Sequence, residues 1–211
     1  MALRILLSRY APLGLGSLYL ILATPAARAS LEATMSAHML VQIPLLATTG
    51  YFACLLLPKP WQDKLLVVMG GAIPCVLLAI FASSYWMLPR ALDAALSHPL
   101  AEGAKFLSLP FLVGLPLALA WKRLSIIGRG FVWANFISML AVLGWLYIAA
   151  PVRVCNNYLV NQQEITGWRM VGLAFIIFLW GLSILFIGGN PVQLDNGAAN
   201  ASNQEMQTGR L

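Results

Sequence analysis

The feature that most constrains this chain is a series of long apolar stretches that contain no charged residue. Of its 211 residues, 60% are hydrophobic and only 9% are charged. A water-soluble domain carries about 25% charged residues, because polar groups must cover its surface. The composition therefore argues against a soluble enzyme, a disordered chain and a nucleic-acid-binding protein, despite a formal net charge of +6. We expect lipid to surround most of this protein.

Apolar segments of about 20 residues are long enough to cross a membrane as α-helices. The chain contains four such segments, and a fifth that is shorter and includes Pro110 and Pro116, which spanning helices tolerate. The five segments are 37–57, 65–85, 104–121, 131–151 and 170–188. We predict an all-α fold, a polytopic transmembrane helical bundle of five to six spans over residues 30–188.

The two ends of the chain differ from the bundle. Arg4 and Arg9 precede a short apolar run, and small residues around Arg28 resemble a signal-peptidase site. Residues 1–29 are therefore either a signal peptide or a first transmembrane helix, which would be the sixth span. Residues 189–211 are polar and almost free of large apolar side chains, so we predict a disordered cytoplasmic tail.

Lysine and arginine near the ends of spans favour the cytoplasmic side. If the segment 37–57 runs from outside to inside, eight basic residues are cytoplasmic and five are external. The first group comprises Arg4, Arg9, Lys59, Lys64, Lys122, Arg123, Arg129 and Arg210, and the second comprises Arg28, Arg90, Lys105, Arg153 and Arg169. This topology places His38, His98 and the loop thiol of Cys155 on the outer side.

A group of soft metal ligands begins the first of these spans. Met35, His38, Met39 and Gln42 are spaced i, i+3, i+4 and i+7, so on a helix they form one stripe. Thioether sulfur and imidazole nitrogen together suit Cu(I) better than Mg, Ca or Mn. The alternative is an interfacial histidine with its polar tip in water, beside methionines that only fill space.

The outer loops add further candidate ligands. Met87 and His98 lie in the outer loop 86–103, and Cys155 lies in the last outer loop, 152–169. A deprotonated thiol is a strong ligand for Cu(I) or Zn, although this one has no CxxC partner and a loop cysteine without a function is the alternative. The amide run that begins at Asn161 is interpreted as a hydrogen-bonded cap of the loop. The complete candidate metal set is Met35, His38, Met39, Met87, His98 and Cys155.

No recognised catalytic motif occurs in the sequence. A Ser/His/Asp arrangement, an HExxH motif, a phosphate loop and a glycine-rich dinucleotide turn are all missing, so we predict no catalytic residue and no enzymatic activity. A transporter is a weaker alternative, because transporters place charged or polar groups near the membrane midplane and these spans carry few of them.

Three short segments resemble one protein family. They are WMLPRALDAALSHP (86–99), the pattern His38-Met39-x-x-Gln42, and Asn161-Gln162-Gln163 followed by Gly167 and Trp168. In order and spacing they are similar to the CtaG-type cytochrome c oxidase assembly factors over roughly residues 35–182. Members of that family are polytopic inner-membrane proteins associated with copper delivery to the oxidase.

The chain departs from the family pattern at four places. Ile43 and Met87 stand where the family has histidines, the helix start 101–106 lacks histidine, and Asn161 replaces an acid. His38 matches directly, whereas Met87 is only a substitute donor. Either the site has changed from imidazole to thioether ligands, or the metal function is lost and the scaffold is kept.

The resemblance implies an accessory protein or metallochaperone in a bacterial inner membrane that holds Cu(I) at the outer membrane face. It also implies partners, namely haem-copper oxidase subunits or a periplasmic copper protein, within membrane lipid. The alternative is a non-enzymatic structural subunit or scaffold of a membrane respiratory complex, without a metal site.

Overall fold

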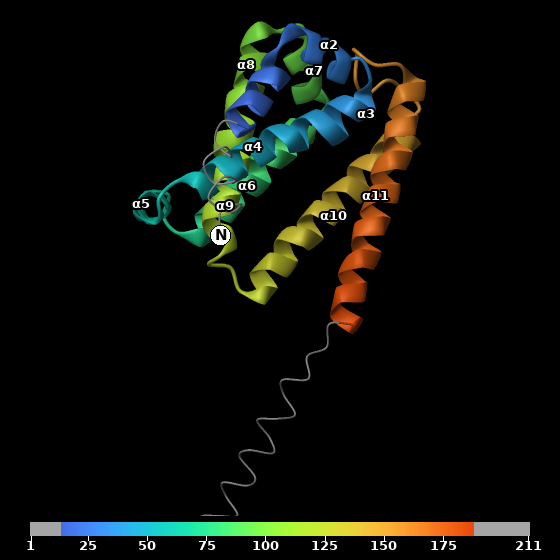
Figure 1. The fold of residues 1–211 in the computed structure, drawn as a ribbon. Helices are drawn as coiled ribbons and strands as arrows, with labels where there is room; N and C mark the ends of the chain where they lie inside the picture. Colours follow the sequence, from blue (N-terminus) through green and yellow to red (C-terminus); the bar gives the residue numbers. More distant parts are fainter. Residues whose placement is uncertain (1–13, 188–211) are drawn as a thin grey trace, which may run out of the picture. The chain divides into compact units, whose positions relative to one another are not determined.

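The computed structural model describes residues 14–187, and within them every regular element is helical (Figure 1). This confirms the predicted all-α class. The whole predicted tail, residues 189–211, and the basic start of the chain lie outside the described residues. The chain divides into two compact units, Met1–Ala174 and Phe175–Leu211. Every contact discussed below lies within the first unit, and of the second the structure describes only the end of the last helix.

The described helices follow one another with short connections. An apolar helix, Gly14–Ala23, precedes α2. The elements after it are α2 (Pro25–Glu32), α3 (Met35–Ala37), α4 (Ile43–Leu56), α5 (Lys59–Val68), α6 (Ala72–Met87), α7 (Pro89–Ser97), α8 (Pro99–Ser108), α9 (Leu115–Trp121), α10 (Ile126–Ala149) and α11 (Val160–Ile187). Two π-helical turns, His38–Gln42 and Leu109–Gly114, join α3 to α4 and α8 to α9.

Four continuous helical stretches are long and apolar enough to cross a membrane, which makes this a multi-pass membrane protein by length and composition. They are Met35–Leu56, Pro99–Trp121, Ile126–Ala149 and Val160–Ile184. The stretch with two prolines remains continuous because Pro110 lies in the π-helical turn Leu109–Gly114, whose larger diameter accommodates the residue without an N–H group.

The predicted span 65–85 is not one straight helix. It is broken between α5 and α6, whose axes differ by 77°, and it counts as a fifth span only if this bent pair is taken together. The break lies at Gly70 and Gly71, which have φ angles of 82° and 104°. Only glycine adopts such angles without strain, so the pair ends one helix and redirects the chain into the next.

Glycines also set the closest contacts in the bundle. A Cβ atom on Gly50 of α4 would lie 2.0 Å from the carbonyl oxygen of Pro110, and one on Gly114 would lie 2.0 Å from that of Ala47. The two backbones therefore pack directly against each other, as small residues allow in membrane bundles. Cys54 and Cys75 are buried among apolar side chains.

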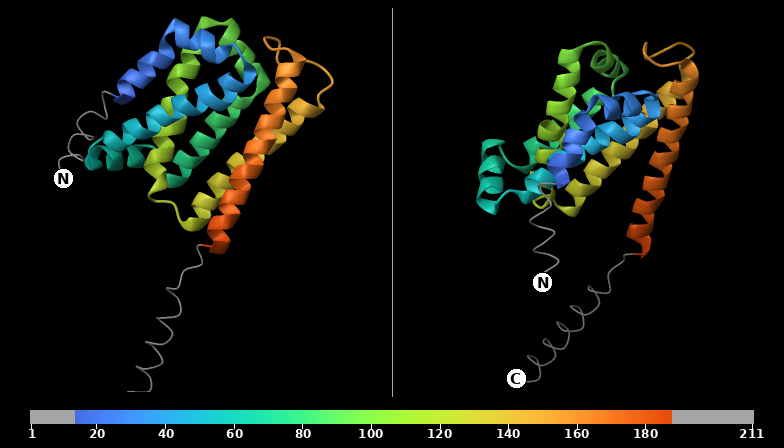
Figure 2. Two further views of the ribbon diagram at one scale, coloured as in Figure 1. Left: turned by 45° about the vertical axis from the view of Figure 1, so that its right-hand side comes forward. Right: turned by 45° about the horizontal axis from the view of Figure 1, so that its top comes forward.

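A second pair of glycines joins α10 to the first half of α11. A Cβ atom on Gly167 would lie 2.6 Å from the Gly144 carbonyl oxygen, and one on Gly144 would lie 2.9 Å from the Gly167 carbonyl oxygen. Figure 2 shows the end of α10 and the first half of α11 side by side next to the loop that connects them. The crossing holds that loop at the end of the bundle where α2 and α7 also lie (Figure 1).

We expect Gly50→Ala to destabilise the protein by about 1–3 kcal/mol, because the added methyl group must push the α4 backbone away from Pro110. Gly172→Ala in α11 is the matched control, since nothing lies within 4 Å of its Cβ position. The control should be neutral or stabilising by about 0.5–1 kcal/mol, as alanine is a better helix former. Unfolding of the purified protein in mixed micelles measures both values, and equal values would contradict the direct backbone contact.

Candidate functional site

Lys105, in the second turn of α8, is the centre of a buried polar cluster. Its side chain is 0% exposed. The ammonium group donates to Glu32 Oε1 at 2.7 Å and to Gln42 Oε1 at 3.1 Å, and it lies 3.2 Å from His38 Nε2. An ammonium group has three N–H donors, so each one has a partner. This is the condition under which a charge can stay buried in a low-dielectric interior.

The partners of Lys105 come from α2 and from the first π-helical turn. Glu32 is the last residue of α2, whereas His38 and Gln42 are the first and last residues of the turn. The backbone N–H of Ile43 bonds to the carbonyl oxygen of His38, five residues earlier. This wider turn directs both side chains to Lys105, which confirms that His38 and Gln42 share one face.

Tyr158, from the loop between α10 and α11, closes the cluster on the other side of the imidazole. Its hydroxyl lies 3.0 Å from His38 Nδ1 and donates to the main-chain oxygen of Glu32 at 2.9 Å. The hydroxyl proton is therefore used, and Nδ1 must carry a proton to donate to this oxygen. Nε2 then accepts from Lys105. The hydrogen bonds thus assign a neutral histidine with its proton on Nδ1.

We call these five side chains the Lys105 network: Glu32, His38, Gln42, Lys105 and Tyr158. Gln42 Nε2 also donates to Glu32 Oε1, at 3.0 Å, so this carboxylate oxygen accepts from two side chains. Burial raises the pKa of Glu32, but the hydrogen bonds from Lys105 and Gln42 and the positive charge of Lys105 outweigh it. The net result is a pKa below the ordinary value, and an ionised Glu32.

A second ion pair strengthens the link between α2 and α8. Arg28 of α2 forms a salt bridge with Glu102 of α8, one turn before Lys105. The Arg28 guanidinium carbon also lies 6.0 Å from the centre of the Phe106 ring. Two acid–base pairs, one in each direction, therefore hold these helices together.

The loop that carries Tyr158 is fixed by polar side chains at both ends. Asp93 of α7 accepts from the backbone N–H groups of Asn156 and Asn157, at 2.8 and 3.2 Å. Gln163 accepts from the N–H of Val154 at 2.9 Å and donates to the carbonyl oxygen of Tyr147 at 3.2 Å. The predicted role of the amide run as a loop cap is confirmed for Gln163.

The candidate metal ligands occupy different environments. Met35, His38 and Met39 are buried in α3 and the π-helical turn, and His98 is exposed in the connection between α7 and α8. Met87 and Cys155 are buried and share Tyr147 as a neighbour, whose hydroxyl lies 3.4 Å from the Met87 carbonyl oxygen and hydrogen-bonds to Cys155. Among the described residues, no three His, Cys, Asp or Glu side chains gather with the geometry of a metal site.

The two strongest predicted donors do not fit Cu(I) in this arrangement. His38 Nε2 is directed at an ammonium group, and Nδ1 is protonated, so neither nitrogen offers a free lone pair. Burial, together with the negative charge of Asp93, raises the pKa of the Cys155 thiol to about 12. The thiol is therefore protonated at neutral pH, whereas the thiolate is the form that binds metal.

Glu32 and Lys105 are the residues whose importance the sequence analysis missed. Lys105 lies six residues after the start of the continuous stretch Pro99–Trp121. A charge at that depth in a spanning helix needs a partner, because lipid cannot solvate it. An acid just before the neighbouring span, which is the position of Glu32, was the signal that could have identified the pair.

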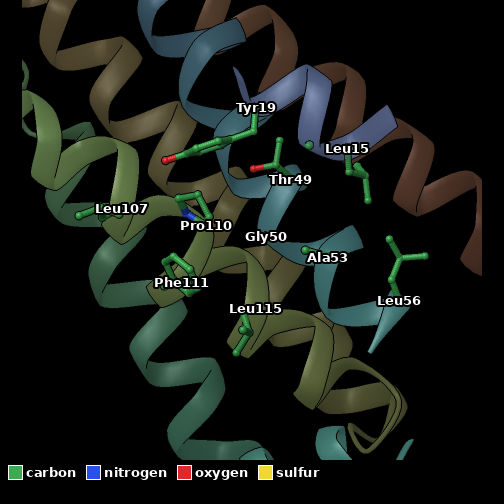
Figure 3. A pocket seen from close by; sticks show the side chains of 11 residues that line it. Leu15, Tyr19, Thr49, Gly50, Ala53, Leu56, Leu107, Pro110, Phe111 and Leu115 are labelled. Carbon is green, nitrogen blue, oxygen red and sulfur yellow. The ribbon is translucent and has the colours of Figure 1, made fainter. Parts of the chain in front are cut away.

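An apolar pocket of about 510 Å³ lies near the network, between the helix Gly14–Ala23, α4 and the region around Pro110 (Figure 3). Its two side-chain hydroxyls are already used within the protein. Tyr19 donates to the carbonyl oxygen of Phe106 at 3.1 Å, and Thr49 donates to that of Leu46 at 2.7 Å. Neither hydroxyl therefore has a proton left to donate to a ligand in this pocket.

We expect Glu32→Gln to lower the free energy of unfolding by about 3–5 kcal/mol, because it leaves the fully buried Lys105 charge without its partner, and Lys105→Met to lower it by less, because Glu32 is only partly buried. The double variant should lose less than the sum, with a coupling of about 0.5–3 kcal/mol, since it removes both charges together. Unfolding in mixed micelles gives the three values. Lys64→Met on exposed α5 is the control, and additive losses would contradict direct pairing.

The pKa of Glu32 also predicts how stability depends on pH. The folded state holds this pKa below its ordinary value of 4.5, so the contribution is fully present above that pH. It is lost as the pH falls through the lower pKa of the folded state. We therefore expect the melting temperature of the wild-type protein to fall more steeply between pH 5 and about pH 3 than that of Glu32→Gln. Parallel curves would show that another group is responsible.

The comparisons with known proteins add no relative. Neither the models of protein families, nor the curated proteins, nor the solved structures include a match to this chain.

Proposed function

We propose that the protein is a non-enzymatic scaffold or accessory subunit of a membrane respiratory complex. The resemblance of its short motifs to the CtaG-type assembly factors suggests a haem-copper oxidase as the complex, and a bacterial inner membrane as the location. The observation that carries the proposal is the contact of 3.2 Å between Lys105 and His38 Nε2. The resemblance implies that His38 is a copper ligand, but the lone pair of its Nε2 atom accepts a hydrogen bond from the Lys105 ammonium group.

The Lys105 network supports a structural role for this end of the bundle. It joins α2, the π-helical turn, α8 and the loop that begins after α10, through side chains that are mostly buried. A fully paired network of this kind is rigid and specifies one arrangement of the helices. It would hold the outer loops in a fixed shape for a protein partner.

The second candidate function is the binding of Cu(I) at the end of the bundle that contains the Lys105 network. Three buried thioethers, those of Met35, Met39 and Met87, favour it. Thioether sulfur is a soft ligand that suits Cu(I) and needs no deprotonation. In this version His38 would have to leave Lys105 before it could bind the metal.

One experiment separates the two candidates. The tagged protein is purified from native membranes as wild type, His38→Ala and the control His98→Ala, whose side chain is exposed. Bound copper is measured by elemental mass spectrometry, and co-purified haem by absorbance. A scaffold predicts haem with the wild type and with His98→Ala, and the same trace copper in all three.

Two outcomes would contradict the scaffold. About one copper per chain in wild type and His98→Ala, but not in His38→Ala, would favour the Cu(I) candidate. Absence of haem from every preparation would contradict membership of a respiratory complex.

A further inference from the structure

A second cavity, of about 210 Å³, lies between α5 and α9. These elements are at the end of the first unit away from α2 and α7 (Figure 1). Its apolar part is formed by Leu66, Ala118 and Leu119, which are all buried. Its polar part is formed by Lys59, Gln62, Asp63, Lys122 and Arg123. The cavity is thus lined by apolar residues on one part and by polar and mostly charged side chains on the other.

The charges around this cavity are not balanced. Lys59, Lys122 and Arg123 are positive, and Asp63 is the one negative side chain in the lining. Arg123 and Asp63 pair with each other at 2.6 Å, whereas neither lysine forms a salt bridge within residues 14–187. Two positive charges therefore remain uncompensated at the opening, and they attract an anion.

The wall of the cavity is held in place from within. Gln62 donates both amide hydrogens to the end of α4, at 3.1 Å to the Cys54 carbonyl oxygen and 2.8 Å to that of Leu57. The first turn of α5 is thereby fixed to α4. Because Lys59 is in this same first turn, the hydrogen bonds of Gln62 hold its backbone in place without a bound ligand.

Helix α5 has the properties of a helix that lies at a membrane surface. Trp61 is 58% exposed, and the Lys64 ammonium lies 5.7 Å from the centre of its ring. Val67 and Val68 are also largely exposed. Tryptophan and lysine beside exposed apolar residues are typical of the head-group region. The cavity therefore opens at the depth of lipid phosphates, at the end that the basic residues predict to be cytoplasmic.

We propose that this cavity binds a phosphate group, with Lys59, Lys122 and Arg123 as its cationic contacts. The volume is below the roughly 300–1,000 Å³ of pockets for drug-sized ligands, so it suits a group of this size. The phosphate is that of an anionic phospholipid or a free phosphate ion. The position of α5 favours the lipid, because basic pockets between spanning helices bind lipid head groups.

The test uses the full chain in detergent at constant ionic strength, with thermal unfolding as the readout. Phosphatidylglycerol, phosphatidylcholine and inorganic phosphate are titrated separately, with sodium chloride as the salt control. We expect phosphatidylglycerol to raise the melting temperature and phosphatidylcholine to leave it unchanged. The double variant Lys59→Gln/Lys122→Gln should raise the half-saturating concentration of phosphatidylglycerol roughly tenfold or more.

The matched control is Lys64→Gln/Arg129→Gln. It removes the same charge from the same end of the bundle but from residues outside the cavity lining. This control should keep the wild-type response to phosphatidylglycerol. Inorganic phosphate acting alone, with no added effect of the lipid, would assign the site to the free ion. Equal weakening by both double variants, no weakening by either, or an equal response to phosphatidylcholine would overturn the proposal.

Discussion

The fold depends on one constraint, which is that a lysine fully buried between helices must keep its charge satisfied by protein groups alone. Lys105 meets this constraint with three partners, from α2 and the π-helical turn at the start of the first span. The ammonium stays paired only while α2 holds Glu32 beside it and the π-helical turn holds His38 and Gln42 beside it. Tyr158, from the loop after α10, keeps the His38 ring in the orientation that this pairing needs. The glycine contacts at Gly50 and Gly114 then fix how closely α4 can approach the helix that carries the lysine.

Hydrophobic length predicted the helical class and most of the spans, because any helix that crosses lipid must be apolar over about 20 residues. It failed at Gly70 and Gly71, since apolar composition does not distinguish a straight helix from two helices joined by a turn. The stripe formed by His38 and Gln42 was predicted from spacing, and the structure confirms that both face one partner. That partner was missed, because Glu32 and Lys105 are 73 positions apart and helix periodicity carries no information about such pairs.

The same cluster changes how the family resemblance is interpreted. The motif residues resemble a copper-associated pattern, but a ligand requires a free lone pair as well as the correct residue type. His38 has both ring nitrogens engaged, and the loop thiol of Cys155 is held in its protonated form. This chain lacks some of the histidines of the family pattern, and it contains an ion pair between Lys105 and Glu32 in which the two charges neutralise each other. This combination supports the proposed scaffold rather than the Cu(I) candidate.

The glycine break between α5 and α6 has a consequence for the surrounding bilayer. Helix α6 has 16 residues, which at 1.5 Å per residue extend for about 24 Å. The hydrocarbon core of a typical membrane is about 30 Å thick, so α6 alone is too short to cross it. With α5 at the membrane surface, as proposed above, the lipid beside α6 has to become thinner. The hydrophobic thickness at α6 is thus smaller than at α10, whose 24 residues extend for about 36 Å.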